Sequence, residues 1–293
     1  MITRTERLLA EFVNREAQVD YFRRMLDEAE RPILVLWGNG GLGKSSLVTR
    51  LIAECKDRNV TTAQIDESGH GNYLSILRAI RDAVSTEPFA QFNDLVNFFT
   101  VRNYSLTIHI DSPGPIRVAE GANISGSQVG DIAGVIVKDF NILEPRNDMD
   151  VPAEERMARL TDRFLQDLAT AAGGGRRIVV FFDAAEKMPK DTRDWVWSRL
   201  LAPLLERALP NVRFVFAGRE KPAVERFMSF IVQESELVPL KQEHIVDYLK
   251  RRGVNEEHRD ELATLLLAVS EGNPHMIALQ TDRYLETKRA RGA

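Results

Sequence analysis

The sequence predicts an α/β fold, with a mostly parallel, helix-flanked sheet followed by a small helical subdomain. Three observations lead to this prediction. Apolar runs of strand length alternate with helical patterns up to about residue 240, a glycine-rich turn joins the first run to a helix, and only helical patterns follow residue 240. Uninterrupted apolar runs are typical of parallel strands buried on both faces. We therefore expect an α/β domain over residues 1–240 and a helical subdomain over residues 241–293.

The first part of the chain contains the elements around the glycine-rich turn. Residues 33–37 are apolar, and apolar side chains at helical spacing follow residue 43. Further amphipathic patterns and one more strand pattern lie on either side of this pair. In this part we expect helices over residues 16–30, 73–84 and 92–101, and strands over residues 33–37 and 60–66.

The stretch 103–150 differs in character from the rest of the chain. It carries a glycine every few residues between 121 and 134, with strand-like patterns over 105–110 and 135–142. Glycine at this density suits turns or a mobile loop. We interpret the stretch as an insertion in the α/β domain, either a small β-rich element or partly disordered.

The second part of the chain contains two more buried-strand patterns. Residues 178–182 are wholly apolar and end in Asp183, and residues 212–217 form a similar run followed by Gly218 and Arg219. Such runs predict central strands of a parallel sheet. We also expect a last strand over residues 237–240, and helices over residues 152–172, 195–209, 242–252, 257–271 and 274–289.

Composition limits the classes of function. The chain has 293 residues, 44% of them hydrophobic, which is ample for a packed core. A net charge of -4 predicts no general attraction to nucleic acid or anionic membranes, and a single cysteine excludes an intrachain disulfide. No signal-peptide pattern and no apolar run near the ~18 residues of a membrane span are present. We expect a cytoplasmic protein with neither membrane nor nucleic acid as a partner.

The glycine-rich turn carries the most specific motif. Residues 38–45 read Gly-Asn-Gly-Gly-Leu-Gly-Lys-Ser and match the phosphate-loop pattern G-x-x-x-x-G-K-[ST]. Glycines let the backbone point several N–H groups at one anion, and the next helix adds the positive end of its dipole. Lys44 should reach the β- and γ-phosphates, and the Ser45 hydroxyl should coordinate Mg²⁺. We expect nucleotide contacts from Gly38, Asn39, Gly40, Gly41, Leu42, Gly43, Lys44, Ser45 and Ser46.

Charged residues follow both later strand patterns. Asp183 would lie beside the phosphate loop and hold Mg²⁺, while Glu186 could polarise the water that attacks the γ-phosphate. The alternative for Glu186 is a solvated carboxylate at the start of a helix. Arg219 would face the same sheet edge, because the carboxyl ends of parallel strands meet there, and could sense the γ-phosphate. Its alternative is a surface arginine.

Four further segments fit one family pattern. They are Phe-Val-Asn-Arg-Glu over 12–16, Phe-Phe-Asp-Ala-Ala-Glu over 181–186, Val-Arg-Phe-Val-Phe-Ala-Gly-Arg over 212–219, and Glu-Gly-Asn-Pro over 271–274. Together with the phosphate loop they resemble the signal-transduction ATPases with numerous domains, the STAND class of NACHT- and NB-ARC-like P-loop NTPases, and their AAA+ relatives. The order of the motifs matches over nearly the whole chain, except for residues 103–150.

The resemblance implies a set of functional properties. ATP and ADP with Mg²⁺ would be the cofactors, and hydrolysis would be slow and regulatory, with Asp183, Glu186 and Arg219 as catalytic residues. Pro274 would pack beside the adenine, opposite Val13 and Arg15. The family also implies self-assembly in the ATP state and protein partners. The chain lacks an N-K-x-D pattern for reading guanine, which agrees with ATP.

The chain departs from the family pattern at several points. Asn14 replaces the usual glycine of the N-terminal motif, and Ala184 replaces an acidic residue that many AAA+ proteins have. No winged-helix or sensor-repeat pattern follows residue 290. We expect either a nucleotide-binding fragment of a larger switch or a minimal member that relies on partners.

Three functions remain open at this point. The first is a regulatory ATPase switch. The second is a DNA-acting AAA+ ATPase resembling origin-recognition initiators, which salt-dependent DNA affinity would support. The third is a small-molecule kinase with residues 103–150 as a lid, which a phosphorylated acceptor would reveal. The strand ending in Asp183, the strand ending in Arg219 and the helical subdomain favour the switch.

Overall fold

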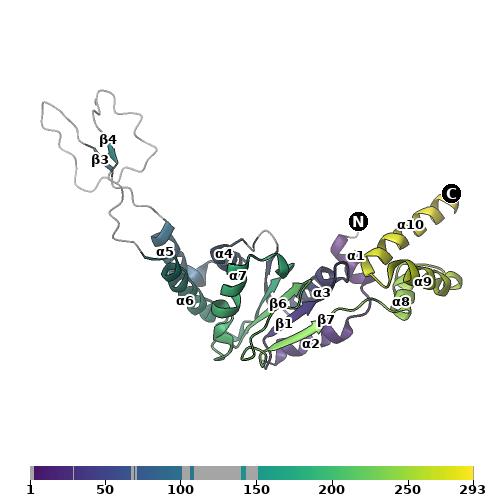
Figure 1. Cartoon of the computed structure of the whole chain (residues 1–293), viewed down its shortest axis with the longest axis horizontal. Helices are drawn as coiled ribbons and strands as arrows, with labels where there is room; N and C mark the ends of the chain where they lie inside the picture. The colour runs from purple at the N-terminus through teal and green to yellow at the C-terminus, as the bar shows by residue number, and fades with distance from the viewer. Residues whose placement is uncertain are drawn as a thin grey trace. The chain divides into compact units, whose positions relative to one another are not determined.

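The computed structural model (Figure 1) describes residues 3–28, 30–66, 69, 71–100, 106–108, 140–142 and 151–292. The chain divides into two compact units, one of residues 1–93 with 157–293 and one of residues 94–156. The first unit contains the α/β sheet and the helical subdomain. In the second, β3 (Leu106–Ile108) pairs antiparallel with β4 (Phe140–Ile142). The remainder of the predicted insertion lies outside the described residues, so the insertion stays a prediction.

The first unit contains a five-stranded sheet in which every pair of neighbours is parallel. β1 occupies an inner position between β6 and β7, and β5 lies between β6 and β2. Strands β5 and β6 are buried at every residue, as their apolar sequences predict. The parallel α/β prediction is confirmed. In sheet order the strands are β2 (Thr61–Ile65), β5 (Ile178–Phe182), β6 (Val212–Gly218), β1 (Ile33–Trp37) and β7 (Val232–Glu236).

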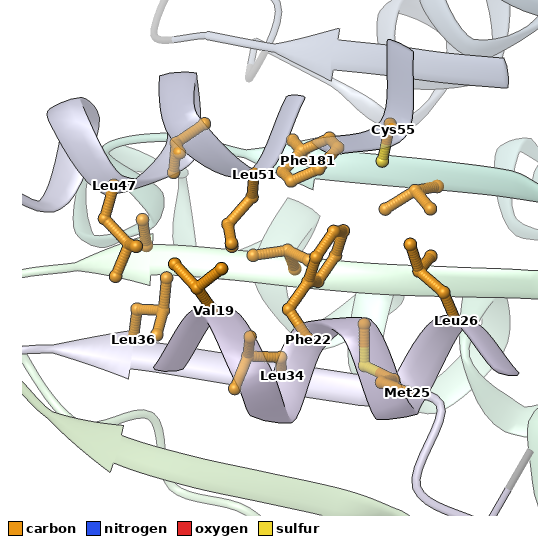
Figure 2. Close-up of a cluster of buried hydrophobic side chains, with 14 of the residues drawn as sticks. Val19, Phe22, Met25, Leu26, Leu34, Leu36, Leu47, Leu51, Cys55 and Phe181 are labelled. Carbon is orange, nitrogen blue, oxygen red and sulfur yellow. The ribbon is translucent and has the colours of Figure 1, made fainter. Parts of the chain in front are cut away.

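One face of the sheet is covered by α2 (Glu16–Asp27) and α3 (Lys44–Asp57). Their apolar side chains meet those of β1, β5 and β6 in one buried cluster (Figure 2). At its centre the rings of Phe22 and Phe181 lie 6.0 Å apart. Because this cluster fixes the start of α3 against the end of β1, it also fixes the turn between them.

Aromatic side chains line the opposite face of the sheet. Phe216 of β6 stacks on Phe182 of β5 at 4.7 Å and on Trp197 at 5.2 Å. Trp195, also buried, donates from its ring N–H to the Thr161 hydroxyl over 3.1 Å. The remaining helices of this part of the chain are α4 (Tyr73–Val84), α5 (Ala90–Thr100), α6 (Ala153–Ala171) and α7 (Lys190–Trp195).

The predicted helix over residues 195–209 is wrong. Helix α7 ends at Trp195 and continues as a π-helical turn (Val196–Leu200) and a 3₁₀ turn (Ala202–Leu204). Pro203 explains why no α-helix continues through residues 199–203, since proline lacks an N–H and its ring clashes with the carbonyl four residues earlier. The apolar spacing that suggested a long helix still places Leu200 and Leu204 in the core.

The predicted strand over residues 237–240 is also wrong. The last strand, β7, lies just before it, at the sheet edge beside β1, and its sequence is mostly polar because the strand is only partly buried. Leu237 and Leu240 are apolar for a different reason. Leu237 belongs to the core of the sheet and Leu240 to the core of the helical subdomain, so residues 237–240 connect the two.

An N-terminal helix, α1 (Arg4–Glu11), was not predicted. Thr3 and Glu6 form a reciprocal capping box at its start, with the Glu6 N–H donating to the Thr3 hydroxyl and the Thr3 N–H to the Glu6 carboxylate. That cap is a recognised helix-start pattern in the sequence. The helix is short and largely polar, so the apolar periodicity that identified the other helices is weak here.

The helical subdomain consists of α8 (Gln242–Arg251), α9 (Glu256–Ser270) and α10 (Pro274–Gly292), as predicted apart from small shifts at the ends. It has its own apolar core, formed by Leu240, Ile245, Tyr248, Leu249, Val254, Ala263, Leu266 and Ile277. Within the described residues, no helix is both long enough and apolar enough to cross a membrane.

Candidate functional site

The glycine-rich turn lies between the end of β1 and the start of α3, as the motif predicts. Gly43 is the residue before α3 and adopts the left-handed conformation, with φ 85°. Glycine enters this region without steric cost, which lets the chain turn sharply into the helix. The first N–H groups of α3 therefore open onto the turn, where a phosphate would gain both hydrogen bonds and the helix dipole.

Lys44 lies across this turn. Its Nζ donates to the carbonyl oxygens of Gly38, over 2.6 Å, and of Asn39, over 2.8 Å. Burial is the largest effect on the pKa of Lys44 and lowers it, Glu186 and Asp183 act to raise it, and Arg219 acts to lower it. Among the described residues Lys44 makes no ion pair. A half-buried ammonium group held only by carbonyl oxygens fits an anionic ligand.

The acidic residues after β5 lie within electrostatic range of Lys44. Asp183 accepts a hydrogen bond from the Ala184 N–H over 2.9 Å. Ala184 has φ 53°, a left-handed conformation that is costly for alanine, and it precedes the 3₁₀ turn that contains Glu186. Backbone strain of this kind is concentrated at functional sites.

Glu186 pairs with Arg219 from the neighbouring strand end. The backbone N–H of Arg219 donates to Glu186 Oε2 over 3.1 Å, and the side-chain Nε of Arg219 lies 3.4 Å from Glu186 Oε1. The Glu186 side chain is only 15% exposed, whereas that of Arg219 is 65% exposed. The guanidinium of Arg219 also lies within 4.0 Å of the place that a Cβ on Gly40 would occupy. The sheet edge thus brings Lys44, Glu186 and Arg219 together around the turn.

A cavity of about 370 Å³ opens beside the turn. It is lined by the turn and α3 on one side and by the helical subdomain on the other, and its volume suits a small ligand. Val13, Leu42, Gly43, Ser46, Pro274 and Ile277 are among its lining residues. The predicted contacts Val13, Ser46 and Pro274 therefore share one cavity, although they come from three distant segments of the sequence.

The predicted contact residue Arg15 also lines this cavity, but its guanidinium is directed at backbone. Its Nη2 donates to Val238 O over 2.7 Å and to Leu42 O over 3.3 Å, and its side chain is buried. Burial lowers its pKa. In this geometry Arg15 holds the turn to the connection that follows β7.

A larger cavity, about 570 Å³, lies on the aromatic face of the sheet. It is lined by Trp197, Phe216, Phe227 and Glu186, among others. No residue of the 38–45 motif lines it, although strand β1, which precedes the motif, contributes to its wall. Size alone therefore does not identify the site. The smaller cavity, which the phosphate-loop motif and the helical subdomain share, is the candidate site for the nucleotide.

A protein-family comparison decides the family. The model of the AAA ATPase domain matches residues 11–216. The chain belongs to the AAA ATPase domain family. This range contains the turn, Asp183 and Glu186, and membership implies nucleotide binding at the phosphate loop. The AAA+-related P-loop core predicted from the motifs is confirmed. No curated protein matches the sequence at a significant level.

Solved structures share the fold of this AAA ATPase domain. The Walker-type ATPase PABY2304 of Pyrococcus abyssi matches with 18% identity and a TM-score of 0.51, over 97% of this chain and 69% of that chain. Cdc6p from Pyrobaculum aerophilum matches with 14% identity and a TM-score of 0.51, over 94% of this chain and 63% of that chain. Drosophila ORC bound to DNA matches with 14% identity and a TM-score of 0.50, over 99% of this chain and 60% of that chain. The chain thus spans less than two thirds of the latter two chains, and the likeness shows the fold alone.

The residues of this AAA ATPase domain fit a magnesium-bound nucleotide. Ser45 lies in the first turn of α3, and Asp183 directly follows β5 at the same sheet edge. These are the positions that metal ligands occupy in phosphate-loop proteins. Within the described part of the chain no cluster of three or more acidic, histidine or cysteine side chains could hold a metal ion by itself.

The departure at Asn14 has a structural explanation. Asn14 has φ 52°, a left-handed conformation that glycine adopts freely and that asparagine tolerates better than most other residues. Its amide lies 3.3 Å from the Nδ1 atom of His244 in α8. The AAA ATPase domain therefore keeps the turn of the motif while it adds a contact to the helical subdomain.

Sequence reasoning missed two groups of residues around the cavity. Asn273 contacts the turn from the helical subdomain, and its position before Pro274 was a cap signal that could have been noticed. The second group is an ionic cluster at the cavity rim. Arg252 of α8 pairs with Glu11 of α1 and with Asp282 of α10. No local pattern in the sequence indicates contacts between segments this far apart.

Proposed function

We propose that this AAA ATPase domain is an ATP- and ADP-dependent signalling switch of the STAND class, with slow Mg²⁺-dependent hydrolysis. The cavity between the turn and the helical subdomain carries the proposal. A nucleotide whose phosphates bind at Gly43 and Lys44 would place its base against Pro274 and Ile277, and so would touch both parts of the protein at once. A ligand shifts a conformational equilibrium by its difference in affinity between the two states.

The proposed roles follow from the geometry of the sheet edge. Lys44 would move from its carbonyl contacts to the β- and γ-phosphates, and Ser45 and Asp183 would hold Mg²⁺, whose charge neutralises phosphate oxygens. Glu186 would take the proton of a water molecule as its oxygen bonds to the γ-phosphorus, and the bond to the β-phosphate oxygen would break to give ADP and phosphate. Arg219 would sense the γ-phosphate.

The pairing of Glu186 with Arg219 supports slow turnover. A carboxylate that accepts from the Arg219 N–H and faces its guanidinium is not free to take a proton from water. A γ-phosphate that attracts Arg219 would release Glu186. Hydrolysis would then start only after this exchange, as a persistent signal requires.

Partners belong to the proposal as well. We propose self-assembly in the ATP state and protein partners or further domains that supply input and output. The expectation that nucleic acid is not a partner rests on the net charge, the lack of a winged-helix pattern and Ala184. The shared fold does not support it, since the Drosophila structure is of ORC bound to DNA. A cytoplasmic location likewise stays a prediction.

The test measures free phosphate released from Mg-ATP, together with ATP binding by calorimetry. Lys44→Ala should lose detectable binding while it keeps the fold, because its ammonium is the group expected to bind the β- and γ-phosphates. Glu186→Gln should bind ATP but hydrolyse it about 10²–10⁴ times more slowly. Glu220→Gln is the matched control, since this neighbouring carboxylate is exposed and should leave both readouts unchanged.

The outcomes separate the candidate functions. Unchanged ATP affinity in Lys44→Ala would overturn the assignment of the turn, and hydrolysis at the parent rate in Glu186→Gln would exclude Glu186 as the general base. Phosphate on an acceptor molecule rather than in solution would favour a kinase. DNA binding that weakens steeply with salt would favour the initiator-like alternative.

A further inference from the structure

The N-terminal end of α10 contacts the phosphate-binding turn directly. Asn273 Nδ2 donates to Gly40 O over 3.2 Å, and the His275 N–H donates to Gly41 O over 3.2 Å. The next carbonyl, that of Leu42, accepts from Arg15 over 3.3 Å. Three consecutive carbonyls of the turn are therefore held by donors that lie outside it, two of them from the helical subdomain.

These contacts set the direction of the turn's N–H groups. A trans peptide is planar, and its C=O and N–H point in opposite directions. The Gly40 carbonyl shares a peptide with the Gly41 N–H, and the Gly41 carbonyl shares one with the Leu42 N–H. When α10 holds these carbonyls, the two N–H groups point away from α10. Successive N–H groups that face one concave side form an anion-binding nest.

We propose that Asn273 is a positioning residue that orients the Gly41 and Leu42 N–H groups for phosphate. The proposal rests on the nucleotide site proposed above and adds a role that its motif does not include. Asn273 needs no contact with the nucleotide, since it acts through the backbone of the turn. The helical subdomain thereby influences phosphate binding separately from any contact that Pro274 makes with the base.

The side chain of Asn273 is fixed at both ends. Its Oδ1 caps α10 by accepting from the His275 N–H over 3.0 Å and from the Met276 N–H over 3.3 Å, while its Nδ2 serves the turn. Asparagine suits both tasks, because it is a good helix cap that also carries a donor. Serine caps equally well but is too short to reach Gly40, and aspartate caps but has no donor when ionised.

The turn is also packed against this amide. A Cβ on Gly41 would lie 2.6 Å from Asn273 Oδ1 and 2.7 Å from its Nδ2, and Gly41 has φ 78°. Glycine is thus required here both for the conformation and for the close approach. Since neither side of this contact has spare room, a displacement of α10 must change the hydrogen bonds of the turn. By linkage, phosphate binding must then favour one position of α10.

The test compares Asn273→Ser with the parent in Mg-ADP titrations. The cap is kept and one hydrogen bond to the turn is lost, so the Kd should rise about twofold to tenfold. The melting temperature without nucleotide should fall by no more than about 2–4 °C, the effect of one lost hydrogen bond in a domain of this size. Asn72→Ser is the matched control, because Asn72 caps α4 in the same way, accepting from the Ser75 N–H over 3.0 Å, and does not line the cavity.

Inorganic pyrophosphate, in competition with a fluorescent ADP, separates positioning of the turn from packing on the base. Asn273→Ser should weaken pyrophosphate by the same factor as ADP. Asn273→Asp, which also keeps the cap, should weaken both ligands at least as much and serves if the serine variant is unstable. Parent-like affinities in both variants would overturn the role of Asn273 alone. A parent protein that does not bind ADP would overturn the proposed function and this inference together.

Discussion

The sheet and the helical subdomain differ in how they are held in place. The sheet core joins long apolar side chains from α2, α3 and three strands, including the contacting rings of Phe22 and Phe181 (Figure 2). The helical core is smaller and contains no phenylalanine among its described buried members. Because stabilisation by apolar burial grows with the area removed from water, the sheet should be the more stable of the two.

Several polar contacts join the two parts. The subdomain meets the turn through Asn273 and the N-terminal helix through Arg252, and Arg15 ties the connection at Val238 to the turn. A hydrogen bond contributes only about 0.5–1.5 kcal/mol net, since water can replace either partner. Such contacts can be exchanged at small cost. The comparison suggests that the sheet acts as the rigid frame and the subdomain as the part that responds to nucleotide.

The largest predicted difference between the two parts lies in their cores. Phe22→Ala should cost about 3–5 kcal/mol, and it should destabilise the whole first unit because Phe22 is fully buried against the sheet. Leu249→Ala, also at a fully buried site, should cost about 2–5 kcal/mol but act mainly within the subdomain. Urea unfolding measures the cost, and hydrogen exchange shows where it falls.

Exchange rates distinguish a separate subdomain from one cooperative unit. In Leu249→Ala the amides of α8, α9 and α10 should exchange faster, while those of β5 and β6 keep the parent rates. Leu265→Ala on α9 is the control, since this leucine is 57% exposed and its loss should change stability by less than about 0.5 kcal/mol. Equal acceleration in β5 and α9 would contradict the comparison.

A bound nucleotide should reduce the difference between the two parts. If Pro274 packs on the base, Mg-ADP at a hundredfold excess over Kd stabilises the native state by about 2.7 kcal/mol. Pro274→Gly should gain clearly less at the same ADP concentration. Thermal unfolding with and without Mg-ADP measures this. Pro222→Gly is the control, because it alters the unfolded chain in the same manner but lies outside the candidate nucleotide cavity. It should gain as much stability from Mg-ADP as the parent.

Equal gains in Pro274→Gly and the parent would show that Pro274 does not help to hold the nucleotide. In that case the subdomain would act on the site through the turn alone, by way of Asn273. Asn273 and Pro274 are consecutive residues at the start of α10, yet they make separate predictions for ADP and for pyrophosphate.

The smallest predicted effect concerns the ionic cluster at the cavity rim. A hydrogen bond from Arg252, with help from its charge and from Arg7, lowers the pKa of Asp282 below its ordinary value of 3.8. A depressed pKa contributes stability above the unfolded value that is lost as pH falls through the folded one. Asp282 is 43% exposed, so solvent screening limits the contribution to below about 1 kcal/mol.

Asp282→Asn should therefore be slightly less stable than the parent at pH 7, and the gap should close as the pH falls below 3.8. Urea unfolding at low salt across this range measures it. Asp194→Asn is the control, because Asp194 pairs with Lys190 on the surface of α7, where both side chains are exposed and join no second element. A gap that widens at low pH would contradict the sign of the shift.

The sequence predicted the buried parts of the fold best. Residues 178–182 are apolar because both faces of β5 are covered, so their composition alone predicts a central strand. The edge strand β7 has one open side and a polar sequence, and it was missed. The turn after Trp195 was missed because its side chains keep helical spacing up to Pro203, while the backbone does not.

The candidate site divides in the same way. The phosphate loop could be predicted because neighbouring residues define it, and Asp183 because it ends a recognisable strand. The partner of Gly40 could not, since Asn273 lies 233 positions away in the sequence. Arg15 was expected at the nucleotide, but its guanidinium engages backbone carbonyls, and no sequence pattern fixes the direction of one long side chain.

The bond between Leu240 and Gly272 has a consequence for chain topology. The Leu240 N–H donates to Gly272 O over 2.7 Å, and any side chain on Gly272 would collide with the Leu240 carbonyl. The two ends of the segment 241–271 are therefore joined by this hydrogen bond. Extra residues in the connection between α8 and α9 would lengthen this segment without moving its ends. Related chains can thus vary in length there while Asn273 and Pro274 keep their places beside the turn.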